Sequence, residues 1–94
     1  QAYLQVLKQL IGELLSVQNS SAIIPYAQRW LTIEPLNEEI LRLLIGLYIQ
    51  IGQFSAALRQ YERYTRILRL ELGLDPSPET RALYKQLLSL YNQK

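Results

Sequence analysis

The chain has 94 residues, of which 49% are hydrophobic and 19% are charged, with a formal net charge of +2 at pH 7. This composition allows one domain with a packed core and excludes a disordered or low-complexity chain. The sequence contains no Cys and no His, which excludes disulfides, thiolate metal sites and the commonest general base.

The longest apolar run, residues 43–49, is far shorter than the roughly 18 residues that a membrane-spanning helix needs. No basic segment followed by an apolar stretch opens the chain, so we expect a cytoplasmic protein that neither enters a membrane nor is secreted. Because the chain begins with Gln rather than Met, we expect it to be a fragment of a larger protein.

Apolar residues recur at spacings of three and four along the whole sequence, which predicts an all-α fold. The first expected helix covers residues 2–17. A second helix follows, capped by Ser20 or Ser21, with Pro25 near its first turn, and it ends before Pro35. Its predicted inward face carries Ile23, Ala27, Trp30 and Leu31.

The third expected helix begins after Asn37, a good N-cap, and has Glu38 and Glu39 in its first turn, where the helix dipole favours carboxylates. It is apolar on nearly every side, so we expect it to be the buried centre of the domain. Gly52 is expected to end it in the left-handed conformation.

The fourth expected helix runs from Phe54 to Leu72 and stops at Gly73. The residues predicted to face inward are Ala57, Leu58, Tyr61, Tyr64, Leu68 and Leu72. A fifth helix is capped by Ser77, with Pro78 at its favoured first position. It presents Leu83, Leu87, Leu88, Leu90 and Tyr91.

Two halves of the sequence match each other at a shift of 34 residues, the period of the tetratricopeptide repeat. The matched pairs include Leu7 with Leu41, Ile11 with Ile45 and Gly12 with Gly46. The pattern predicts a tetratricopeptide-like right-handed superhelix of two helix-turn-helix repeats with a C-terminal capping helix. The alternative is an ordinary five-helix bundle with accidental periodicity.

Residues 57–88 combine the end of a long helix, the turn sequence ELGLDPSP at 71–78 and the helix start RALY at 81–84. This stretch resembles the C-terminal half of the bacterial transcriptional activation domain found in antibiotic-regulatory-protein type activators. The segment PLNEE at 35–39 is similar to the middle of that family. The resemblance covers nearly the whole chain, so residues 1–94 are expected to form one such domain. The prolines also fix a corner by themselves, so the turn serves geometry as well.

The resemblance implies a regulatory helical domain that follows an N-terminal winged-helix DNA-binding domain. In that family the helical domain takes part in self-association or in contacts that regulate transcription. No segment of this chain could be the DNA-binding domain. The resemblance therefore implies that the partner is a protein or a second copy, and that DNA is reached only indirectly, through the missing N-terminal domain.

The repeat geometry also predicts a partner-binding surface, because the first helix of each repeat lines the concave side of such a superhelix. The predicted partner-binding residues are Gln5, Lys8, Gly12, Glu39, Arg42, Gly46 and Gln50. The two glycines stand at equivalent positions although glycine destabilises a helix. They indicate either tight packing between neighbouring helices or a groove that a partner approaches closely.

Four arginines, Arg59, Arg63, Arg66 and Arg69, lie along the outward side of the fourth expected helix. They form either a solvated face with ion pairs such as Glu62 with Arg66, or a contact to DNA phosphates. Tyr48, Tyr61, Tyr64 and Trp30 could stack on single-stranded nucleic acid, but their inward positions favour core packing.

No constellation of residues suits catalysis, a metal ion or a cofactor, so we expect no enzyme activity and neither kind of site. Three hypotheses remain at this point. The first is the regulatory interaction domain of a transcriptional activator. The second is a free-standing tetratricopeptide adaptor that binds a peptide or partner protein in its concave groove. The third is direct nucleic-acid binding through the arginines.

Overall fold

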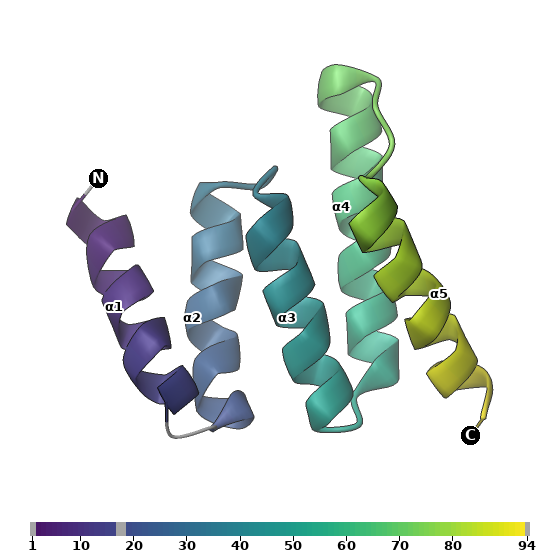
Figure 1. The fold of residues 1–94 in the computed structure, drawn as a ribbon. Helices are drawn as coiled ribbons and strands as arrows, with labels where there is room; N and C mark the ends of the chain where they lie inside the picture. Colours follow the sequence, from purple (N-terminus) through teal and green to yellow (C-terminus); the bar gives the residue numbers. More distant parts are fainter. Residues whose placement is uncertain (1, 17–18, 94) are drawn as a thin grey trace.

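The computed structural model describes the backbone of residues 2–16 and 19–93 and the side chains of residues 2–12 and 19–93. Within these ranges the chain forms five helices and no strand: α1 (Ala2–Ser16), α2 (Ser20–Ile33), α3 (Glu38–Gln50), α4 (Phe54–Leu72) and α5 (Pro78–Asn92). Consecutive helices run in opposite directions and stand in a row from α1 to α5 (Figure 1). The all-α prediction is confirmed, and residue 17 of the first expected helix lies outside the described ranges.

The third helix is the centre of the packing. Each helix packs against the next one along the chain, and α5 packs against α3 as well as α4. Contacts from α2, α4 and α5 therefore surround α3, which agrees with its apolar sequence. Its buried residues are Ile40, Leu41, Leu44, Ile45, Leu47 and Tyr48.

The helix boundaries repeat along the chain. α1 ends at Ser16 and α3 at Gln50, while α2 begins at Ser20 and α4 at Phe54. Both pairs are one period of 34 residues apart, the period expected from the sequence. Burial follows the same period at one matched pair: Leu7 and its counterpart Leu41 are 1% and 0% exposed to solvent.

The start of α2 differs from the prediction in two ways. The N-cap is Asn19 rather than Ser20 or Ser21, and its side-chain oxygen accepts a hydrogen bond from the Ala22 amide at 3.2 Å. Pro25 lies in the second turn of α2, not near the first. Because proline has no N–H, the helix gives up one internal hydrogen bond there.

The remaining caps follow the sequence prediction. Asn37 Oδ1 accepts a hydrogen bond from the Ile40 amide at 3.1 Å, and Ser77 Oγ accepts one from the Thr80 amide at 3.4 Å. Gly52 and Gly73 adopt φ angles of +75° and +65°, the left-handed region in which glycine has no steric penalty. The two corners on either side of α4 are therefore set by local sequence.

Two residues expected to face inward do not. Leu72 is 56% exposed and Tyr91 is 40% exposed. Both occupy the last turn of a helix, where a neighbour is missing. The end of α4 projects beyond the other helices, and α5 begins well below that tip (Figure 1). Helical periodicity alone could not reveal that α4 is longer than the helices it packs against.

The buried position of α3 makes a stability prediction. Leu41 is completely buried, so Leu41→Ala should lower the free energy of unfolding by about 2–5 kcal/mol through lost apolar contacts and a residual cavity. Urea denaturation followed by circular dichroism measures this change. Leu70→Ala removes the same atoms from a side chain that is 79% exposed and should change stability by less than about 0.5 kcal/mol. Equal losses in the two variants would contradict this assignment of the core.

Candidate partner-binding groove

A groove with a cavity volume of about 620 Å³ lies between α1, the end of α2 and the start of α3. Its lining residues are Leu4, Gln5, Lys8, Trp30, Glu34, Asn37, Glu39, Ile40 and Leu43. Leucine and isoleucine side chains alternate there with amides and charges. Such a mixture of apolar surface and a few polar groups is typical of recognition sites.

Three of the predicted partner-binding residues meet in this groove. Gln5 and Lys8 reach it from α1, and Glu39 reaches it from the first turn of α3. Gln50 is at the opposite end of α3, where its side-chain oxygen accepts a hydrogen bond from the Ser20 hydroxyl. A binding role for any of these residues stays a prediction.

The two equivalent glycines are open to solvent on the side where a side chain would be. A Cβ atom built at Gly12 or at Gly46 meets no described heavy atom within 4 Å. Tight packing between neighbouring helices is therefore the wrong explanation for either glycine. Neither glycine lines the groove, and a role in partner binding stays a prediction for both.

Arg42 has a structural role in this fold. Its guanidinium donates to Glu38 at 3.3 Å and to the Thr80 hydroxyl at 3.1 Å, and it lies 3.8 Å from the Glu79 carboxylate. Arg42 thus braces α3 against the first turn of α5. A charge reversal at Arg42 would first disturb this contact, so it is a poor probe of partner binding.

Glu38 is the centre of a polar cluster that joins three helices. Its carboxylate accepts hydrogen bonds from the Thr80 hydroxyl at 2.6 Å, from the Ser77 amide at 3.0 Å and from the Ser77 hydroxyl. The Tyr64 hydroxyl of α4 lies 3.2 Å from the same carboxylate. Thr80 is completely buried, so its hydroxyl depends on these partners for hydrogen bonding.

The cluster shifts two pKa values. Burial by itself would raise the pKa of Glu38, but the hydrogen bonds donated by Ser77, Thr80 and Tyr64 outweigh it, and the net pKa is lowered. The pKa of Tyr64 is raised to about 12, because burial and the adjacent Glu38 charge both disfavour the phenolate.

The carboxylate of Glu34, on the rim of the groove, accepts hydrogen bonds from the Trp30 indole N–H at 2.7 Å and from the side-chain amide of Asn37 at 3.0 Å. These two bonds lower the pKa of Glu34. Trp30, Glu34 and Asn37 were not predicted as groove residues. The sequence signal that could have predicted them is the Asn37 cap together with the proline turn beside it, because these bring the end of α2 against the start of α3.

The arginines of α4 are exposed, as expected, but they do not form the predicted row of ion pairs. Arg69 pairs with Asp75 at 3.0 Å. Among the residues whose side chains are described, no carboxylate lies within 4.0 Å of Arg59, Arg63 or Arg66, so the pair of Glu62 with Arg66 does not form.

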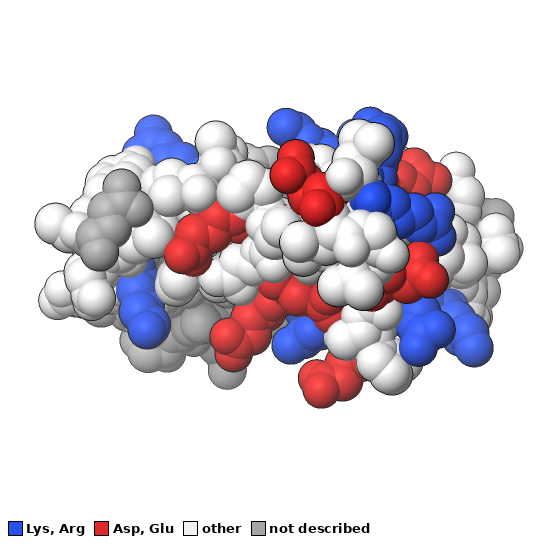
Figure 2. Space-filling model, turned by 90° about the horizontal axis from the view of Figure 1, so that it is seen from above, with Lys and Arg blue, Asp and Glu red and all other residues white. Residues whose placement is uncertain are grey.

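Charge is unevenly spread over the end of the molecule where α3 begins. Acidic side chains lie across its middle, whereas basic side chains gather mostly toward α4 and α5 (Figure 2). The groove shares this acidic character, because it contains Glu34 and Glu39 against the single cation Lys8.

The aromatic residues are used mainly in packing. Tyr48, Tyr61 and Tyr64 are buried, and the rings of Tyr61 and Tyr84 stack with centroids 4.1 Å apart and an interplanar angle of 8°. This contact fixes α5 on α4. Trp30 differs from the expectation because it is only half-buried and borders the groove.

The described part of the chain contains no cluster of three or more acidic, His or Cys side chains that could hold a metal ion. None of its helices is long and apolar enough to cross a membrane.

The sequence matches the family described as bacterial transcriptional activator domain over residues 1–88. The chain belongs to this family.

Relatives of this bacterial transcriptional activator domain include the transcriptional regulatory protein MoaR1 of Mycobacterium bovis (strain BCG / Pasteur 1173P2) and of Mycobacterium tuberculosis (strain ATCC 25618 / H37Rv). Each is 36% identical over 70 residues, which is 73% of this chain and 22% of the relative. The chain therefore spans about a fifth of the length of these relatives. No solved structure matches it with comparable significance.

The Glu38 cluster predicts how stability depends on pH. A carboxylate whose pKa is lower in the folded chain stabilises the fold above its unfolded pKa, and this contribution is lost as the pH falls through its folded pKa. The free energy of unfolding should therefore fall as the pH drops below about 4.5. Glu38→Gln should be less stable at neutral pH by about 1–3 kcal/mol and show a shallower decline in acid. Urea denaturation between about pH 7 and about pH 3 tests both points.

Glu39→Gln is the matched control for this experiment, since it removes the same charge from the same helical turn but lies in the groove instead of at α5. It should keep the acid decline of the unmodified chain. If Glu38→Gln retains the full decline, the cluster does not stabilise the domain in the way described.

The open space at Gly46 gives a second prediction. Gly46→Ala should stabilise the isolated chain by about 0.5–1 kcal/mol, because alanine suits a helix interior better and meets no atom there. Gly73→Ala should instead cost about 1–2 kcal/mol, since Gly73 is left-handed. Thermal and urea denaturation measure both changes, and a destabilising Gly46→Ala would restore the tight-packing explanation.

Proposed function

We propose that this bacterial transcriptional activator domain is the non-catalytic regulatory part of a cytoplasmic transcriptional activator. It acts by binding a protein partner or a second copy of itself, and DNA is recognised by another part of the protein. Family membership supports this role, and so do the transcriptional regulatory relatives, in which the matched 70 residues are 22% of the length. A net charge of only +2 argues against independent binding to nucleic acid.

The arrangement of helices that would carry this function is a tetratricopeptide-like superhelix of two hairpins and a capping helix. The 34-residue period of the helix boundaries supports it, and so does the packing of α5 on both helices of the second hairpin. In repeat proteins of this kind the first helices of the hairpins border the binding surface. Here these helices are α1 and α3.

The observation that carries the proposal is the convergence of Gln5, Lys8 and Glu39 in one groove with apolar walls. The walls include Leu4, Ile40 and Leu43, which would accommodate an apolar side chain of the partner. Carboxylates outnumber cations on the rim, so the fitting partner segment carries a Lys or Arg beside that side chain. The groove therefore favours a basic, partly apolar segment over an acidic one.

Charge reversal on the rim tests the proposal in the full-length activator. Glu39→Lys should lower transcription from its promoter about threefold to tenfold, because the partner's cation loses its counterion, a loss of up to about 1.4 kcal/mol. Affinity for promoter DNA should stay unchanged. Reporter assays and electrophoretic mobility shifts measure the two quantities separately.

Glu71→Lys provides the control, since it makes the same change at an exposed position near the end of α4, outside the groove. It should leave transcription unchanged. Unchanged transcription with Glu39→Lys would defeat the groove as the partner site. A matching loss of DNA affinity would show that this surface contacts DNA instead.

A further inference from the structure

A second cavity, of about 260 Å³, lies between α2 and α4 and shares no residue with the partner-binding groove. α2 contributes Gln28 and Thr32 to it, and α4 contributes Gln60, Arg63, Tyr64 and Ile67. Trp30, which borders the groove, lies on a different face of α2, and Glu34 follows the end of this helix. The two sites are therefore separate features of the same helix.

The charge in this cavity is positive. Arg63 is the only charged residue among those that line it, and no acidic residue faces it across the cavity. Within the described side chains, Arg63 also has no carboxylate within 4.0 Å. A guanidinium offers five N–H donors in a planar fork that suits carboxylate and phosphate groups. Arg63 is exposed, so its guanidinium is accessible to an anion from solvent.

The walls around Arg63 are held in place by other contacts. Gln28 Nε2 donates to the Tyr48 hydroxyl at 2.6 Å, and the Thr32 hydroxyl donates to the Gln28 carbonyl at 3.0 Å. The Tyr64 hydroxyl is 3.3 Å from the Leu36 carbonyl and 3.2 Å from Glu38, so its ring is a fixed wall. A preformed wall lowers the entropic cost of binding a ligand.

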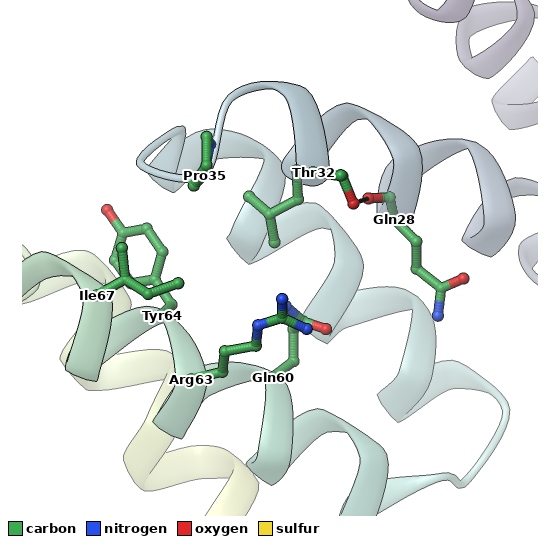
Figure 3. Close-up of a pocket in the computed structure, with 8 residues that line it drawn as sticks. Gln28, Thr32, Pro35, Gln60, Arg63, Tyr64 and Ile67 are labelled. Carbon is green, nitrogen blue, oxygen red and sulfur yellow. Dashed lines mark hydrogen bonds between the residues drawn. The ribbon is translucent and has the colours of Figure 1, made fainter.

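Two polar groups of α4 remain available to a ligand. Arg63 and Gln60 are three residues apart, so they stand on the same side of the helix. Both point from α4 into the space between α4 and α2 (Figure 3). Neither has a side-chain hydrogen-bond partner among the described residues. Ile67 and the ring of Tyr64 provide apolar surface beside them.

We propose that this cavity binds a small organic anion. Its carboxylate or phosphate accepts hydrogen bonds from the guanidinium of Arg63 and the amide of Gln60, and its apolar body packs against Ile67 and Tyr64. The volume is slightly below the range of about 300–1,000 Å³ that is usual for small-molecule sites, which limits the ligand to a compact acid or phosphate ester. The proposal does not depend on what occupies the groove.

The experiment is an NMR titration of the 94-residue chain with three probes of similar shape: benzoate, phenyl phosphate and the neutral benzamide. The proposal predicts saturable shifts in α2 and α4 with at least one of the two anions and none with benzamide. The stronger anion identifies the ligand class as carboxylate or phosphate. A lack of saturable binding by both anions, or equal binding by benzamide, would overturn the proposal.

Two arginine variants separate a specific site from general attraction of anions. Arg63→Gln should weaken binding at least tenfold, whereas Arg59→Gln, which removes the same charge one turn away and outside the cavity, should change it less than twofold. Both residues are exposed, so both variants should fold, as circular dichroism can verify. Equal weakening by the two variants, or no weakening by Arg63→Gln, would reject Arg63 as the anion-binding residue.

Discussion

The fold depends on one carboxylate shared by three helices. Glu38, in the first turn of α3, holds the N-cap Ser77 and the buried Thr80 of α5, and it meets the Tyr64 hydroxyl of α4. Charge-assisted hydrogen bonds of this kind are stronger than neutral ones, and Thr80 has no access to water that could replace them. The cluster therefore fixes where α5 begins, and the stacked Tyr61 and Tyr84 rings fix its direction from there.

With α5 in place, the domain has two separate surface features for which we propose binding roles. The groove beside α3 is acidic and open, which suits a basic protein segment. The cavity between α2 and α4 is small and contains Arg63, which has no ion-pair partner among the described side chains. Tyr64 links the cavity to the Glu38 cluster, because its ring lines the first and its hydroxyl lies in the second. Under these two proposals, a protein segment binds on one side of the domain and a small anion on the other.

Much of the fold could be predicted from the sequence, because its determinants are local. Apolar periodicity gave the five helices, Asn37 and Ser77 gave two caps, and Gly52 and Gly73 gave two stops. The Glu38 cluster could not be predicted, because its partners Ser77 and Thr80 lie about 40 residues away in the sequence. Ser77 and Glu38 also have ordinary roles at helix starts, so nothing in the sequence indicated that they pair. Arg42 was predicted to bind a partner because of its position on the third expected helix. Its contact with Thr80 depends on tertiary packing and could not be foreseen from that position. The groove itself was predicted in part, through Gln5, Lys8 and Glu39.

A double-mutant cycle between Glu38 and Thr80 tests the central claim most directly. Glu38→Ala, Thr80→Val and the double variant are unfolded with urea at neutral pH, and the two single losses are compared with the combined loss. We predict that the sum of the two single losses exceeds the loss in the double variant by about 1–2 kcal/mol, because each substitution removes the same hydrogen bond. Losses that add within about 0.3–0.5 kcal/mol would contradict it, since the two side chains would then stabilise the domain independently.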